Sequence, residues 1–156
     1  VTSPINSAAT IRPAAALDGI ADERVGVTAV WYPQPFGFEA EWNVGRGPSL
    51  SRDFSSIDSD FLQGGYVQVN YKAETTWGVW FPFVRWQRYE GGRKFARNAP
   101  DSSVEEVDFG VEWSPWKEVE VAIAYTHTFH RTNTRTAPYG DADGSDRIGM
   151  QVQWNY

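Results

Sequence analysis

The sequence predicts an all-β fold, a transmembrane antiparallel up-and-down β-barrel, and three observations support this prediction. Polar and apolar residues alternate with a period of two from residue 24 to the C-terminus. The connections between the alternating segments are short and long in turn. The chain ends inside the last segment on an aromatic residue, whereas the termini of soluble domains usually fray.

Seven alternating segments of roughly 10 residues follow one another, which is about the length that a tilted strand needs to cross a bilayer. In the third segment, for example, Val67 and Val69 share a face opposite Gln68 and Asn70. The apolar face of the fourth segment is ambiguous, and we expect a β-bulge at its Pro82, which lacks an amide donor. The segments are residues 24–32, 36–44, 61–73, 77–90, 106–113, 118–129 and 147–156.

The connections fall into two groups that alternate along the chain. Short connections are predicted at 33–35, 74–76 and 115–117, and long polar ones at 47–60, 91–103 and 133–145. Bacterial outer-membrane barrels have short periplasmic turns and longer extracellular loops. The last strand is therefore predicted to end on the periplasmic side of the outer membrane.

Composition excludes several other classes of protein. No stretch approaches the roughly 20 consecutive apolar residues of a membrane-spanning helix. The 156 residues carry a net charge of -6 and no basic stripe, so a nucleic-acid partner is not expected. There is no cysteine, and no residue pattern indicates a cofactor, a metal site or a catalytic residue, so we expect a protein that is not an enzyme.

The number of strands bears on completeness. A complete bacterial barrel has an even number of strands, and the pattern shows about seven. Residues 1–23 are predicted to be an extracellular loop or a weak additional strand, and residues 24–156 to be the transmembrane hairpins. The chain is then the C-terminal part of a larger barrel; with an eighth strand it could instead close as a small barrel filled by its own side chains.

The polar faces of the segments carry the candidate functional residues. Inside a water-filled pore these side chains need no partner, and their charges set selectivity. The carboxylates outnumber the cations, which could line an anion path or balance the carboxylates; glycoside hydrolysis by paired carboxylates is the less favoured alternative. The candidate pore-lining residues are Arg24, Glu39, Glu41, Lys72, Arg85, Glu106, Asp108, Glu112 and Arg147.

Aromatic residues make up 15% of the chain and gather near the ends of the segments. Outer-membrane barrels carry aromatic girdles at the two membrane interfaces. The alternative is a sugar-stacking platform in a soluble, Trp-rich, carbohydrate-binding β-sandwich. The candidate interface aromatics are Trp31, Trp42, Trp86, Trp113, Trp154 and Tyr156, with Trp77 and Trp116 nearby.

Three stretches carry a family resemblance: Phe83 to Trp86, Glu106 to Trp113 and Gly149 to Tyr156. They resemble the C-terminal region of the phosphate-selective porin O and P family, and the last looks like the signal strand that the barrel-assembly machinery recognises. The resemblance implies a trimeric, water-filled barrel of about 16 strands in the outer membrane of a Gram-negative bacterium, surrounded by outer-membrane lipid and passing small anions such as phosphate. A non-conducting barrel that anchors or completes another chain remains a further alternative.

Overall fold

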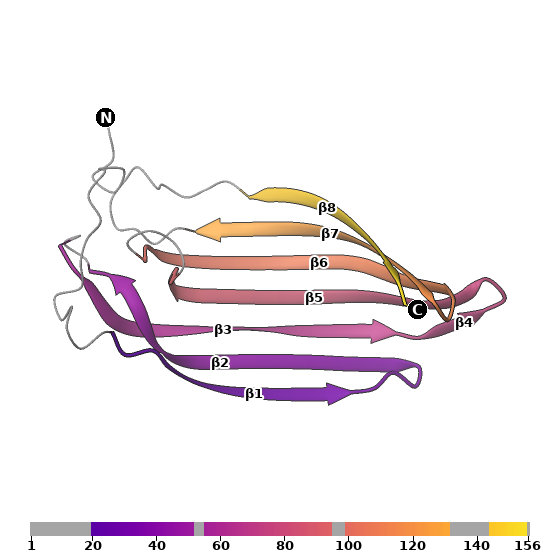
Figure 1. Cartoon of the computed structure of the whole chain (residues 1–156), viewed down its shortest axis with the longest axis horizontal. Coiled ribbons are helices and arrows are strands. Elements are labelled where there is room, and N and C mark those ends of the chain that lie inside the picture. Colours follow the sequence, from indigo (N-terminus) through magenta and orange to yellow (C-terminus); the bar gives the residue numbers. More distant parts are fainter. Residues whose placement is uncertain (1–19, 52–54, 95–98, 132–143, 156) are drawn as a thin grey trace.

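A computed structural model describes residues 20–51, 55–94, 99–131 and 144–155 of the chain, and all of its regular structure is β (Figure 1). No helix among the described residues is long and apolar enough to cross a membrane. The strands are β1 (Glu23–Trp31), β2 (Phe36–Leu50), β3 (Ile57–Tyr71), β4 (Ala73–Thr75), β5 (Gly78–Gly92), β6 (Asp101–Trp116), β7 (Val119–Arg131) and β8 (Ser145–Trp154).

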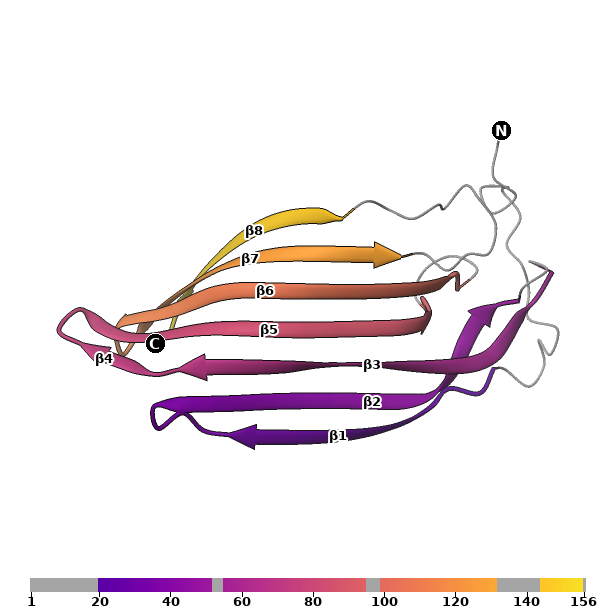
Figure 2. The same ribbon diagram turned by 180° about the vertical axis from the view of Figure 1, so that it is seen from behind.

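The strands form a single antiparallel sheet in which neighbours in sequence are neighbours in space. The order is β1-β2-β3-β5-β6-β7-β8, and the short β4 extends the line of β3 along β5. The seven long strands run side by side in one curved layer, seen from both sides in Figures 1 and 2. Within the described residues β1 and β8 each pair on one side only, so the all-β, up-and-down prediction is confirmed while the sheet does not close on itself.

The register gives the sheet one polar and one apolar face. A row of directly opposed residues crosses the polar face, and we call it the central row: Glu39, Gln68, Arg85, Asp108, Thr126 and Arg147. The residue next to the central row on each strand, on the side of the connection at 32–35, belongs to a neighbouring row, which we call the apolar row. Its side chains are 39% to 77% exposed: Trp31, Phe38, Val69, Val84, Phe109, Tyr125 and Ile148. Because a slip of one residue would exchange the two faces, this register also resolves the ambiguous segment: Arg85 lies on the polar face.

Connections of different length lie at opposite ends of the sheet. The short ones are residues 32–35, 76–77 and 117–118, and the long ones are 51–56, 93–100 and 132–144; we call the second end the long-loop end. The predicted long loops at 47–60 and 91–103 were too wide, because β2 runs to Leu50 while β3 begins at Ile57 and β6 at Asp101. Polar residues occur on both faces of those strand ends, so no alternation marks them. Most of the predicted loop 133–145 lies outside the described residues.

The predicted bulge at Pro82 was wrong. The pairing of β5 with β6 passes through Pro82 and Val111 without a register shift. On its other side the pairs stop at Asn70 and resume at Ala73 in the same register, so a gap between β3 and β4 accommodates the missing amide donor. The register shift of this sheet lies instead between Trp113 and Trp116, beside Pro115.

Candidate functional site

The polar face brings together charged and amide side chains from six neighbouring strands. Beside the central row, towards the long-loop end, a second row consists of Thr28, Glu41, Tyr66, Gln87, Glu106 and Thr128. These residues meet because directly opposed side chains of neighbouring antiparallel strands lie about 5 Å apart at Cβ. The face is therefore a continuous polar surface made of residues far apart in the sequence.

Arg85, in the middle of β5, is held by neutral neighbours. Its Nε donates a hydrogen bond to Oε1 of Gln68 at 2.8 Å. Its guanidinium carbon lies 5.4 Å from the ring centroid of Tyr66 and 5.7 Å from that of Phe83, within the range of cation–π attraction. The Phe83 ring in turn lies over Gly110, where an added Cβ would come within 2.4 Å of it. The guanidinium is thus fixed without an ion pair to any described carboxylate.

The carboxylates of the same face also bond to neutral donors. Glu106 accepts hydrogen bonds from the Gln87 amide and, at 2.9 Å, from Oγ1 of Thr128. Glu41 accepts one from Nδ2 of Asn43 at 2.7 Å. Asp108 is only 6% exposed, and its Oδ1 has no hydrogen-bond partner among the described residues.

Two hollows lie on the polar face. The one nearer the short turns has a volume of about 390 Å³, and Glu39, Arg85 and Glu112 line it together with Gln68, Phe81 and Phe83. The one nearer the long-loop end has a volume of about 510 Å³, and its lining includes Arg24, Tyr66, Tyr89 and Glu106. Both hollows are large enough for hydrated ions and small solutes.

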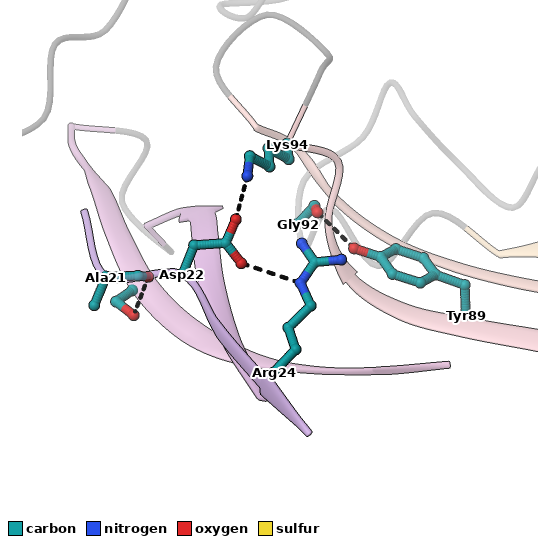
Figure 3. Close-up of polar contacts among 7 residues, drawn as sticks. Ala21, Asp22, Arg24, Tyr89, Gly92 and Lys94 are labelled. Atoms are coloured by element: carbon teal, nitrogen blue, oxygen red, sulfur yellow. Dashed lines mark hydrogen bonds and ion pairs between the residues drawn. The ribbon is translucent and has the colours of Figure 1, made fainter. Parts of the chain in front are cut away.

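A separate cluster joins distant segments at the long-loop end. Lys94, between β5 and β6, and Arg24, on β1, both bond to the Asp22 carboxylate, Arg24 through Nε at 3.0 Å, and Figure 3 shows them on either side of it. The hydrogen bond from Lys94, followed by that from Arg24, holds the pKa of Asp22 below its usual value of 3.8. Sequence reasoning missed Asp22 and Lys94, because both lie outside the alternating segments.

Backbone contacts also hold the strands together at the long-loop end. The amide of Leu50, at the tip of β2, donates to the carbonyl of Ala99 at 2.9 Å. An added Cβ at Gly92 would lie 2.0 Å from the carbonyl oxygen of Pro48, so the tip of β2 rests directly on the end of β5. Leu62, which is 3% exposed, packs against Gly47 and Gly91 at this end. Figures 1 and 2 show the bends at the ends of β2 and β3.

Most of the predicted pore-lining residues share the polar face. Lys72 is apart from them: it lies between β3 and β4, its amide bonds to the Pro35 carbonyl at 2.7 Å, and its Nζ pairs with Glu74 at 2.5 Å. The structure places on the polar face Arg24, Glu39, Glu41, Arg85, Glu106, Asp108, Glu112 and Arg147.

The predicted interface aromatics lie on the other face. Trp42 and Trp86 stack at 6.0 Å across Gly65, where a Cβ would meet the Trp42 ring at 2.7 Å. Nearer the short turns, Trp113 stacks on Trp80 at 5.1 Å, and its Nε1 donates to the Trp77 carbonyl. Trp31 and Trp154 end β1 and β8 on the same side, while Tyr156 lies outside the described residues.

A sheet of long antiparallel strands with one apolar face, one charged face and loops sorted by length is the architecture of an outer-membrane β-barrel porin, of which the described residues form an unclosed part. A family model agrees: the chain belongs to the phosphate-selective porin O and P family, matched over residues 4–156. This is a family of channels and not of enzymes. Comparison with curated proteins and with solved structures gave no match.

Proposed function

We propose that this chain forms part of the wall of a water-filled channel in the outer membrane, through which small hydrophilic solutes diffuse. The observation that carries the proposal is the pair of neighbouring rows: the central row presents charges and amides to one side, and the apolar row presents Val, Phe and Ile to the other. The first suits a lumen filled with water and the second suits lipid. Transport of this kind involves no chemical step.

The aromatic side chains fit the two borders of such a membrane. The Nε1 groups of Trp80, Trp86 and Trp113 bond to polar partners, as Trp86 does to Glu105 at 2.9 Å, while the rings stay on the apolar face. Tryptophan is enriched at the level of the lipid headgroups for this reason. The lengths of the connections distinguish the two borders: because outer-membrane barrels have short periplasmic turns, we assign the short-turn end to the periplasm and the long-loop end to the exterior.

The open edges imply additional strands. Unpaired amides and carbonyls along β1 and β8 cannot face lipid, because nothing there satisfies them. The proposed channel is therefore completed by strands beyond the described residues or from another chain, and oligomerisation to a trimer follows the family pattern. Residues 1–23 then precede the first of these hairpins as a loop or a further strand.

Each alternative function differs from the proposed channel in one property that can be observed. A soluble carbohydrate-binding sandwich requires a second sheet over the apolar face, and within the described residues that face is exposed. A non-conducting anchor barrel would share the fold but pass no ions. Selectivity for phosphate is the narrower function in the family's description, but inward carboxylates outnumber inward arginines on this part of the wall, so we propose diffusion without a phosphate preference from this segment.

Conductance measurements on the full-length protein test the proposal. Detergent-extracted protein that shifts on a gel when heated should, after addition to a planar bilayer, produce stepwise increases in current, and the boiled sample should not. Folded protein that produces no steps would support the anchor barrel. Protein that is extracted by plain buffer would overturn the membrane assignment altogether.

A further inference from the structure

We propose that this part of the channel wall favours cations over anions, through carboxylates whose charge no neighbouring group neutralises. The inference deepens the proposed function and rests on it. It concerns the inner face of β2 to β8, where the hollow of about 390 Å³ lies between Glu39, Arg85 and Glu112.

The balance of inward charge is the first observation. Register places three cations on the polar face, Arg24, Arg85 and Arg147. It places six carboxylates there on the straight parts of the long strands, so this part of the inner face carries an excess of three negative charges, to which Asp58 and Asp60 at the bent end of β3 add. The six are Glu39, Glu41, Glu106, Asp108, Glu112 and Glu120.

The partners of these carboxylates are the second observation. The ion pairs among the described residues involve Asp22, Glu74, Glu90 and Asp146, and none involves any of the six inward carboxylates named above. Glu41 and Glu106 accept hydrogen bonds from amide and hydroxyl groups instead. A neutral donor stabilises a carboxylate without cancelling its charge, so the negative potential extends into the lumen.

The position of Arg85 is the third observation. It is the cation nearest to the middle of the acidic face, directly opposite Asp108 on β6. However, Gln68 and two aromatic rings hold it, and no carboxylate among the described residues pairs with it. The carboxylates around it therefore remain available to mobile ions.

Asp108 gives the independent indication of a ligand. Its side chain is nine-tenths buried on the polar face, and its Oδ1 has no hydrogen-bond partner among the described residues. Leaving a carboxylate oxygen buried without a partner is costly. A partly dehydrated monovalent cation or the ammonium group of a small solute would supply that partner, whereas an anion such as phosphate would be repelled.

The test measures ion selectivity of the full-length protein in a planar bilayer under a tenfold gradient of KCl. We expect a reversal potential on the cation side. Replacing Glu39 or Glu112 by glutamine, which keeps the size and breaks no described hydrogen bond, should lower the ratio of K⁺ to Cl⁻ permeability by about two- to threefold per charge, the size that Coulomb's law gives for a charge several ångströms away in water. Arg85→Gln should raise the ratio.

Glu105→Gln is the matched control, because Glu105 lies on the outer face of the same strand as Asp108 and should leave the ratio unchanged. If one of the inward variants fails to fold, as judged by its shift on a gel when heated, the other provides the measurement. A wild-type ratio below one, or inward variants that leave the ratio unchanged, would overturn the inference while the channel itself stands. Absence of any current would instead overturn the proposed function.

Discussion

The long-loop end of the sheet, which is the extracellular end of the proposed channel, and the middle of its inner face use charge in opposite ways. At the extracellular end Asp22 bonds to two cations from different segments, Arg24 and Lys94, and so ties β1 to the connection after β5. In the middle of the inner face, Arg85 lies directly opposite Asp108 on the neighbouring strand, yet the two form no ion pair. Charge at this end holds segments together, whereas charge in the middle would act on solutes in the proposed channel.

Burial follows the same division. The buried apolar side chains of the described residues, Leu50, Leu62 and Ala99, all lie at the extracellular end. In the middle the buried side chains are polar, among them Gln68 and Thr126. A barrel wall has no apolar core of its own between lipid and water, so the folded-over tip of β2 and β3 is the part of this chain that most resembles the core of a soluble domain.

Leu62→Ala should have the largest effect on stability. The side chain is 3% exposed and packs between Gly47 and Gly91, so truncation leaves a cavity. We expect a loss of about 2–5 kcal/mol in the free energy of unfolding by urea in lipid vesicles. Val69→Ala, on the same strand but on the exposed apolar face, is the control and should cost clearly less. Equal losses would show that the extracellular end is no better packed than the rest.

Gly92→Val should have the next largest effect. Its first side-chain carbon would lie 2.0 Å from the Pro48 carbonyl oxygen, so the tip of β2 must lift from β5. Overpacking of this kind costs about 1–3 kcal/mol, measured by the same unfolding transition. Gly149→Val on β8 is the matched control, because no described atom lies within 4 Å of its added Cβ. If both variants unfold alike, the contact between β2 and β5 contributes nothing to stability.

Asp108→Asn tests whether a carboxylate in the middle of the inner face contributes to the free energy of unfolding, as the carboxylate of Asp22 does at the extracellular end. At the extracellular end a carboxylate stabilises the fold because cations bond to it, but no described group bonds to the Oδ1 of Asp108. Removing the charge should therefore leave the free energy of unfolding within about 0.5 kcal/mol of wild type, or raise it slightly. A clear destabilisation would mean that a group outside the described residues pairs with Asp108, and the contrast between end and middle would fail.

These contrasts define what the sequence could predict. The alternation of Val67 to Asn70 reveals a strand because one face meets lipid and the other meets water. Where a strand end leaves the membrane, as at Pro48 to Leu50, both faces meet similar surroundings and the pattern disappears. Period also gives the face of a charge but not its partner, so it could place Glu106 inward without revealing its bonds to Gln87 and Thr128. The contact of Asp22 with Lys94 joins residues 72 positions apart, which no local pattern encodes.

The smallest predicted effect concerns the pH dependence of the extracellular cluster. Because the pKa of Asp22 is lower in the folded state than its ordinary value of 3.8, the bonds of its carboxylate stabilise the fold fully above that value and are lost as the pH falls through the lowered pKa. An NMR titration of the carboxyl carbon should give a midpoint below 3.8.

Comparing variants in the same titration distinguishes the two cations. Lys94→Met should move the Asp22 midpoint upward more than Arg24→Met does, because the hydrogen bond from Lys94 contributes most to the lowered pKa. The inward residue Arg85 is the control: Arg85→Met should leave the Asp22 midpoint where it was, since Arg85 bonds to Gln68 in the middle of the wall. If the midpoint is the same in all three variants and in wild type, Asp22 does not hold the extracellular end together, and the charges there are as unpaired as those of the lumen.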